Sequence, residues 1–175
     1  MPKARRKRPI KKSRFTAKTA DKHVLYQLSV QAPDTEVLFL NDWFKSIRGK
    51  KPLSLREDFC GTAILCAEWV KSNAERTATG IDIDRGVLAW GEKHNLASLG
   101  DKRERITLLK QDVRAKVKQK HDIICAFNFS YWIFKTRESL RDYFATVRSG
   151  LGKGGLFFLD AYGGWESHEP MQEHR

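Results

Sequence analysis

Short apolar segments alternate with longer amphipathic ones along most of this chain, and this alternation limits the folds that are open to it. Strand patterns are expected at 53–59, 78–83, 106–111, 122–127 and 155–161, and helical patterns at 62–73, 85–99 and 137–149. Strands joined by helical segments of about ten to fifteen residues indicate a parallel sheet with helices on both faces. We therefore expect an α/β fold with a Rossmann-like, doubly wound and mainly parallel sheet.

Two further helical segments precede the first strand. One covers 21–31 and the other 35–48, where apolar residues recur at helical spacing. Gly49 follows the second segment at the position that favours glycine, because the residue after a helix often adopts left-handed backbone. We expect both helices to belong to one domain that covers 21–175.

The first 20 residues are strongly basic. They hold nine of the 33 Lys and Arg residues, two prolines and no acid, whereas the rest of the chain has 24 basic and 21 acidic side chains. A segment of this composition is expected to be disordered, and it could bind the phosphates of RNA. A solvated tail, a nuclear import signal and a mitochondrial presequence have similar compositions, so these alternatives stay open.

The cysteines do not form a recognisable pattern. Cys60, Cys66 and Cys125 are odd in number and lack a CxxC or Cys/His ligand spacing, so neither a disulfide framework nor a metal site is expected. We predict buried thiols in a reducing, cytoplasmic protein. No apolar run approaches the roughly 20 residues of a membrane-spanning helix, and no signal-peptide core follows the basic segment, so no membrane association is expected.

The stretch LREDFCGTA, residues 55–63, is the first strand-to-helix turn, which usually contacts the ligand of such a sheet. A dinucleotide-binding turn needs three glycines so that the backbone can approach a pyrophosphate, and here Phe59 and Ala63 replace two of them. Glu57 and Asp58 would also repel phosphate. S-adenosylmethionine lacks phosphate and carries a sulfonium and an ammonium group, so an acidic turn suits it.

An ordered set of segments resembles the successive motifs of class I S-adenosylmethionine-dependent methyltransferases. The segments are LREDFCGTA (55–63), GIDID (80–84), LLKQDVR (108–114), DIICAFNFSYWIF (122–134) and LGKGGLFFLDAYGG (151–164). The NFSYW and FKTR segments are similar to those of a bacterial methyltransferase-like group. The resemblance implies strand order 3-2-1-4-5, S-adenosyl-L-methionine as cofactor, and methyl transfer to an unidentified acceptor, either a small molecule or RNA.

The resemblance also assigns cofactor-binding residues. Glu57 matches the acid of the family's first motif, and Phe59, Gly61 and Ala63 fall on its three glycines, of which only Gly61 is kept. Asp82 lies 21 positions after Gly61 and matches the acid that binds both ribose hydroxyls. The same spacing would fit a ribose-binding acid in a dinucleotide site.

Three further residues receive roles from the resemblance. Asp112 matches the position near the adenine amino group, although an aspartate in a strand-end turn is an alternative. Asn128 follows the strand where the family places substrate-facing residues near the sulfonium, so we predict it for cofactor binding and, with Tyr131, for catalysis. A buried aromatic cluster is the alternative for Tyr131. Asp84 either assists Asp82 or caps the following helix.

Methyl transfer makes few demands on side chains. It is an in-line displacement at an activated carbon, so alignment can supply most of the catalysis, and a base is needed only for a protonated acceptor. Asp58 and Tyr131 are candidate bases, but the sequence selects neither. His23, His94 and His121 are scattered and are expected on the surface or in helices.

Two other functions stay open. One is a non-catalytic, nucleic-acid-associated module with a methyltransferase-like fold, and the other is a nicotinamide-dependent oxidoreductase, which the acidic turn disfavours. The family typically continues past the fifth strand with a helix and two further strands, which this chain apparently lacks. We therefore expect its last strand to form a sheet edge that a second copy covers.

Overall fold

The computed structural model describes residues 16, 18–164 and 170 of the chain. Most of the predicted disordered tail, and with it the predicted RNA contact, lies outside the described residues. The chain divides into two compact units, Met1–Gln31 and Ala32–Arg175. The first contains helix α1 (Lys22–Val30), which confirms the helix predicted at 21–31, and the side chain of Asp21 caps its N-terminus.

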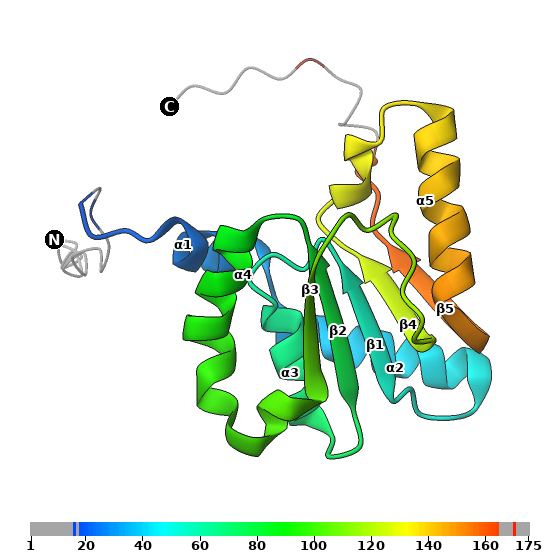
Figure 1. Cartoon of the computed structure of the whole chain (residues 1–175), viewed down its shortest axis with the longest axis horizontal. Coiled ribbons are helices and arrows are strands. Elements are labelled where there is room, and N and C mark those ends of the chain that lie inside the picture. Colours follow the sequence, from blue (N-terminus) through cyan, green and yellow to red (C-terminus); the bar gives the residue numbers. More distant parts are fainter. Residues whose placement is uncertain (1–15, 17, 165–169, 171–175) are drawn as a thin grey trace, which may run out of the picture. The chain divides into compact units, whose positions relative to one another are not determined.

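The second unit is built on a five-stranded parallel sheet of order β3-β2-β1-β4-β5 (Figure 1). The strands are β1 (Ser54–Asp58), β2 (Thr77–Asp82), β3 (Ile106–Lys110), β4 (His121–Ala126) and β5 (Leu151–Leu159). The predicted fold class and strand order are therefore confirmed. The order reverses between β1 and β4, and in such sheets ligands bind at the carboxyl ends of the strands beside that reversal.

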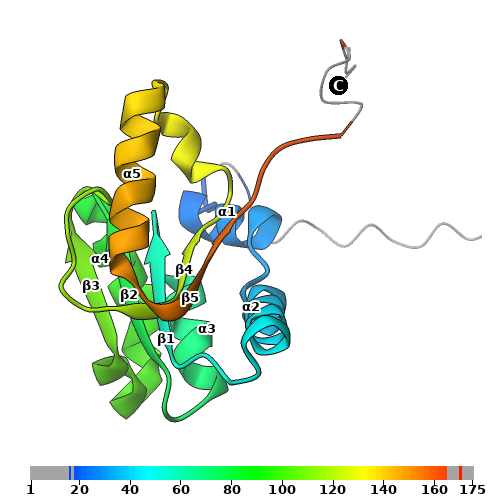
Figure 2. The same cartoon turned by 90° about the vertical axis from the view of Figure 1, so that its right-hand side faces the viewer.

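Helices cover both faces of this sheet (Figure 2). They are α2 (Pro33–Arg48), α3 (Ile64–Ser72), α4 (Arg85–Gly91) and α5 (Arg137–Gly150). Helices α2, α3 and α4 share one apolar core with the sheet, and α5 shares the other. Successive residues of β4 serve the two cores in turn: Ile123 and Cys125 face the first, and Ile124 and Ala126 face the second.

The segment 85–99, predicted as one helix, is helical, but only its first part, α4, is an α-helix. After α4 the chain makes a π turn, η1 (Glu92–Leu96), and then a 3-10 segment, η2 (Ala97–Arg105), in which Gly100 departs from helical backbone. The side-chain amide of Asn95 in the π turn donates a hydrogen bond of 2.8 Å to the carbonyl of Thr62. The wider turn thus ties this segment to the loop that precedes α3.

Strand β5 begins four residues earlier than predicted, because Leu151 already pairs with His121 before the register shifts at the next pair. It pairs only with β4 among the described residues, so its other side is an edge. Its predicted cover by a second copy remains a prediction.

Two expectations about individual side chains have different outcomes. The three cysteines are free and buried, as predicted. His121 is not on the surface or in a helix: it begins β4, is buried, and lies 3.1 Å from the hydroxyl of Thr79, and burial lowers its pKa to about 4. Within the described part of the chain, no helix is long and apolar enough to cross a membrane.

Candidate functional site

The turns that follow β1, β2, β3 and β4 place most of the predicted site residues at the carboxyl edge of the sheet. Gly61, Asp112 and Asn128 lie in the turns after β1, β3 and β4, and Asp82 is the last residue of β2. Glu57 differs, because its side chain is buried among the residues of β1 and α3, where its Oε2 accepts a hydrogen bond of 3.1 Å from the Cys66 thiol.

Asp82 and Gly61 are in direct contact. The backbone N–H of Gly61 donates to Asp82 Oδ2 at 2.8 Å, and the N–H of Asp84 donates to Oδ1 at 2.9 Å. A carboxylate oxygen can accept more than one hydrogen bond, so both oxygens keep capacity for a hydroxyl donor. Gly61 has φ +53°, and a β-carbon built on it would meet nothing within 4 Å. The turn therefore presents open backbone beside an ionisable acid.

Asp84 has a second role. Its side chain accepts hydrogen bonds from the N–H groups of Gly86 and Val87, so it caps the N-terminus of α4. The capping alternative of the sequence analysis is thus confirmed.

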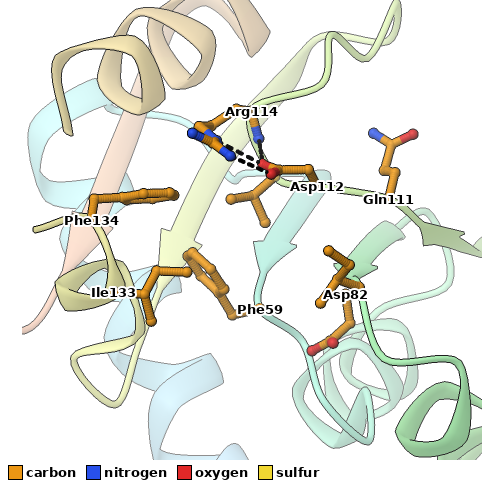
Figure 3. A pocket seen from close by; sticks show the side chains of 9 residues that line it. Phe59, Asp82, Gln111, Asp112, Arg114, Ile133 and Phe134 are labelled. Carbon is orange, nitrogen blue, oxygen red and sulfur yellow. Dashed lines mark hydrogen bonds and ion pairs between the residues drawn. The ribbon is translucent and has the colours of Figure 1, made fainter. Parts of the chain in front are cut away.

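A hollow of about 110 Å³ opens between the ends of β2 and β3, and we call it the β2–β3 hollow (Figure 3). It is lined by Phe59, Asp82, Ile83, Gln111, Asp112, Val113, Arg114, Ile133 and Phe134. The Phe59 ring stands where the family has its first glycine, and it packs against the rings of Phe134 and Tyr143 at 6.1 and 5.9 Å. The hollow therefore combines aromatic walls with the carboxylate of Asp82.

Asp112 lines this hollow, but its carboxylate is already hydrogen-bonded to Arg114. Its two oxygens accept hydrogen bonds from the Arg114 guanidinium at 3.0 and 2.7 Å, and Oδ1 also accepts from the Arg114 backbone N–H (Figure 3). These bonds lower the pKa of Asp112. The carboxylate thus stabilises the turn after β3, which agrees with the alternative of a strand-end turn aspartate. Its predicted role near adenine stays a prediction.

Left-handed backbone at non-glycine residues is confined to two of these turns within the described part of the chain. Phe59 and Ala63 in the turn after β1 have φ of 58° and 54°, and Asn128 and Phe129 after β4 both have φ of 56°. Such conformations cost about 1–3 kcal/mol each and are found preferentially at functional sites. The strain therefore marks the same edge as the predicted residues do.

Asp160, immediately after β5, holds the turn after β4 in place. Its Oδ2 accepts from the N–H of Asn128 at 2.7 Å, and its Oδ1 accepts from the N–H of Phe129 at 2.9 Å. No role was predicted for this residue, although its place directly after an apolar strand was an available signal.

A second hollow, of about 280 Å³, lies beside this turn, and we call it the β4–β5 hollow. It is lined by Ala32, Thr35, Glu36, Phe39, Phe127, Asn128 and Asp160. Asn128 thus lines a different hollow from Asp82 and Asp112.

Tyr131 lies in η3 (Ser130–Ile133) and is buried. Its ring packs against those of Trp132 and Phe144, with centroids 6.5 and 6.3 Å apart. This agrees with the aromatic-cluster alternative, while its catalytic role stays a prediction.

Acidic side chains form an electrostatically connected series along the edge. Burial raises the pKa of Glu57 to about 8, the Cys66 hydrogen bond opposes this, and the charges of Glu36 and Asp82 add to it. Burial also raises the pKa of Glu36, and Asp160 contributes. These acids are therefore close enough to raise one another's pKa, although burial is the main cause. Within the described residues, no cluster of three or more His, Cys, Asp or Glu residues could hold a metal ion.

A buried ion pair joins Arg56 and Asp58 next to the site. Arg56 Nε donates to Asp58 Oδ1 at 2.7 Å, Arg56 Nη2 donates to the carbonyl of Val113 at 2.9 Å, and the Tyr143 hydroxyl donates to Asp58 Oδ2 at 2.9 Å. The network links β1 to the wall of the β2–β3 hollow and to α5. Burial raises the pKa of Asp58 to about 6, although Arg56 opposes the shift. Because its side chain is enclosed, Asp58 is unsuited to be a base for a bound acceptor.

This sheet, with its order 3-2-1-4-5, helices on both faces and an acid at the end of β2, has the class I S-adenosylmethionine-dependent methyltransferase fold. No protein-family model and no curated protein sequence matches the chain. Solved structures do match, as the following three show.

CalS10, an amino pentose methyltransferase from Micromonospora echinaspora solved with S-adenosylmethionine bound, matches with a TM-score of 0.67 and 17% identity over 82% of this chain and 57% of CalS10. DesVI from Streptomyces venezuelae matches with a TM-score of 0.68 and 20% sequence identity, and the match covers 86% of this chain and 61% of DesVI. The glycopeptide N-methyltransferase MtfA, complexed with S-adenosylmethionine, matches with a TM-score of 0.59 and 21% sequence identity. This match covers 79% of this chain and 58% of MtfA. The chain thus spans less than two thirds of each of these proteins.

Proposed function

We propose that this chain binds S-adenosylmethionine at the carboxyl edge of its sheet and transfers the methyl group to an acceptor, either a small molecule or RNA. The observation that carries the proposal is the pairing of Asp82 with the open backbone of Gly61. Asp82 would hold the ribose hydroxyls, and Phe59 and Val113 would flank the adenine ring. These residues fit the cofactor because they offer a carboxylate, aromatic walls and unobstructed backbone within one turn.

Charge supports this cofactor over the phosphate-containing ones. The carboxylate of Asp82, beside the turn after β1, favours the cationic groups of S-adenosylmethionine and opposes a pyrophosphate. The β2–β3 hollow, at about 110 Å³, is smaller than the roughly 300 Å³ at which ligand pockets begin. Part of the cofactor would therefore lie outside it, over the turn after β1.

The chain's own residues would act mainly by alignment. When bound, S-adenosylmethionine supplies an activated methyl group, so the protein need only hold the acceptor in line with the breaking bond. We assign this alignment to Asn128; its support is that Asp160 fixes its backbone and that it lines the hollow next to the turn. Similar folds in CalS10 and MtfA belong to methyltransferases of an amino pentose and a glycopeptide, which supports the reaction class for this chain.

Titration calorimetry with S-adenosylhomocysteine, the product form of the cofactor, tests the proposal, with NADH and ATP as comparison ligands. We expect micromolar binding of S-adenosylhomocysteine and no measurable binding of the other two. Preferential binding of NADH would instead support an oxidoreductase, and binding of none of them would overturn the assigned cofactor.

A further inference from the structure

The β4–β5 hollow differs in charge from the other described hollows. Its lining includes two acids, Glu36 and Asp160, and no Lys or Arg. Each of the other three hollows contains at least one basic side chain; these are Arg114, Lys51 with Arg76, and Lys135. After residue 20 the chain carries 24 basic and 21 acidic side chains, so basic side chains are not scarce in the part that contains this hollow. This hollow therefore disfavours phosphate and carboxylate groups and favours a cation.

Aromatic rings add to this preference. Phe39 and Phe127 line the hollow. The rings of Phe129, Trp132 and Tyr162 form an exposed group near the same turn, with Phe129 lying 5.6 Å from Trp132 and 6.1 Å from Tyr162. The face of an aromatic ring attracts ammonium groups, and exposed rings also bind an apolar or planar body.

The hollow is next to the proposed position of methyl transfer. Asn128 and Asp160 both line it, and the hydrogen bond between them fixes the turn after β4. This turn has strained backbone, so its shape is held by the contact with Asp160 rather than by residue preference. A group bound in the hollow would consequently lie beside the fixed turn.

We propose that the β4–β5 hollow binds the amino group of the methyl acceptor, and that the acceptor is therefore a primary or secondary amine on an apolar or aromatic body. This inference rests on the proposed function. It goes beyond that function by naming the acceptor class and the side chains that select it, Glu36 and Asp160.

The reaction balances with these groups. The acceptor arrives as an ammonium ion and gives one proton to the Glu36 carboxylate, which leaves a lone pair on nitrogen. That pair forms the new N–C bond to the methyl carbon while the S–C bond breaks and its electron pair stays on sulfur, giving S-adenosylhomocysteine and a methylated ammonium product. Burial and the charge of Asp160 raise the pKa of Glu36, which makes it a better proton acceptor than an ordinary carboxylate.

A pair of small probes tests the inference without an identified acceptor. Phenethylamine and phenethyl alcohol share a body and differ in their polar group, and both are small enough for a hollow of about 280 Å³. Each is titrated into ¹⁵N-labelled full-length chain saturated with S-adenosylhomocysteine. We expect the amine to shift the amide resonances of Glu36, Asn128 and Asp160 in a saturable way, and the alcohol to bind at least tenfold more weakly.

Glu36→Gln provides the matched variant. It keeps the size of the side chain and removes its charge, so phenethylamine binding should weaken about tenfold or more. The control is Asp42→Asn, which removes an exposed carboxylate from the same helix outside the hollow and should leave amine binding unchanged. Affinity for S-adenosylhomocysteine should stay within about twofold of wild type in both variants.

The outcomes separate this inference from the proposed function. Equal binding of amine and alcohol, or an unchanged amine affinity in Glu36→Gln, would overturn the amine site. A large loss of S-adenosylhomocysteine affinity in Glu36→Gln would overturn it too, because the hollow would then hold the cofactor's own ammonium group. If the wild-type chain binds no S-adenosylhomocysteine, the proposed function itself fails.

Discussion

The turns after β1 and β4 have similar backbone conformations, but different side-chain contacts hold them in place. Both run through two non-glycine residues with left-handed backbone, and in both a carboxylate after the neighbouring strand accepts backbone N–H groups. Asp160 uses both oxygens on the turn after β4, whereas Asp82 gives one oxygen to Gly61 and the other to its own loop. Both acids thus hold backbone N–H groups, and they differ in position: Asp160 fixes the turn after β4 and lines the β4–β5 hollow, whereas Asp82 contacts the turn after β1 and lines the β2–β3 hollow.

The largest effect is expected for Asp82→Ala. Loss of a charged acceptor for two ribose hydroxyls should lower the affinity for S-adenosylhomocysteine at least about a hundredfold, since such hydrogen bonds contribute about 1.5–3 kcal/mol each. Titration calorimetry measures the change. Asp84→Asn is the control, because asparagine caps a helix as well as aspartate does. Unchanged affinity in Asp82→Ala would sink the assignment of this residue.

Asp160→Ala should act on stability more than on cofactor affinity. Two backbone N–H groups lose a charged acceptor, so the free energy of unfolding should fall by about 2–3 kcal/mol in urea denaturation. The affinity for S-adenosylhomocysteine should fall less than tenfold. A loss of affinity as large as that of Asp82→Ala would show that the two acids do not differ in role.

The raised pKa of Glu57 makes the stability of the chain depend on pH. The folded-state pKa is about 8, above the ordinary value of 4.5, so Glu57 contributes stability that is complete below pH 4.5 and is lost as the pH rises to about 8. His121 opposes this below about pH 6.5, because its folded-state pKa is lowered to about 4.

The chain should therefore be about 2 kcal/mol more stable at pH 6 than at pH 8. Glu57→Gln should remove most of this difference. Denaturation at both pH values tests it, with Glu68→Gln as a control because Glu68 pairs with Lys71 on the outer side of α3. A wild-type chain that is as stable at pH 8 as at pH 6 would contradict the account.

The smallest effect is expected for Gly61→Ala. Left-handed backbone at alanine should cost about 1 kcal/mol of stability, and the new methyl group would project into the open face of the turn and weaken S-adenosylhomocysteine binding several-fold. Gly49→Ala is a matched control, since Gly49 has φ +67° and equally open surroundings at the end of α2. It should lose similar stability with no change in affinity, and equal losses of affinity in both variants would contradict the proposed site.

Sequence reasoning succeeded where one local pattern decides the outcome. Alternating periods predicted the strands and their helical connections. The family resemblance, with the spacing of 21 residues after Gly61, put Asp82 at the end of the second strand. Sequence reasoning failed where tertiary contacts override local preference. The helix expected at 85–99 changes from α to π and then 3-10 geometry, and its widened turn places Asn95 against the carbonyl of Thr62, a contact that no periodicity encodes.

The sequence put candidate site residues at the ends of strands, but it did not indicate the partners of their side chains. Asp160 also follows an apolar strand, but its contacts depend on β5 lying beside β4 and were not assigned from sequence. The bidentate bond between Asp112 and Arg114 likewise changes what a correctly placed acid can do. Pair contacts of this kind require coordinates.

The most direct test of the central claim is to map S-adenosylhomocysteine onto the ¹⁵N-labelled chain by amide chemical shifts. The account predicts the largest shifts at Gly61, Ile83, Val113 and Asn128, which belong to the four turns of the carboxyl edge, and none at Gly49. Shifts confined to other parts of the chain, or the absence of any saturable shift, would contradict the claim that this edge is the cofactor site.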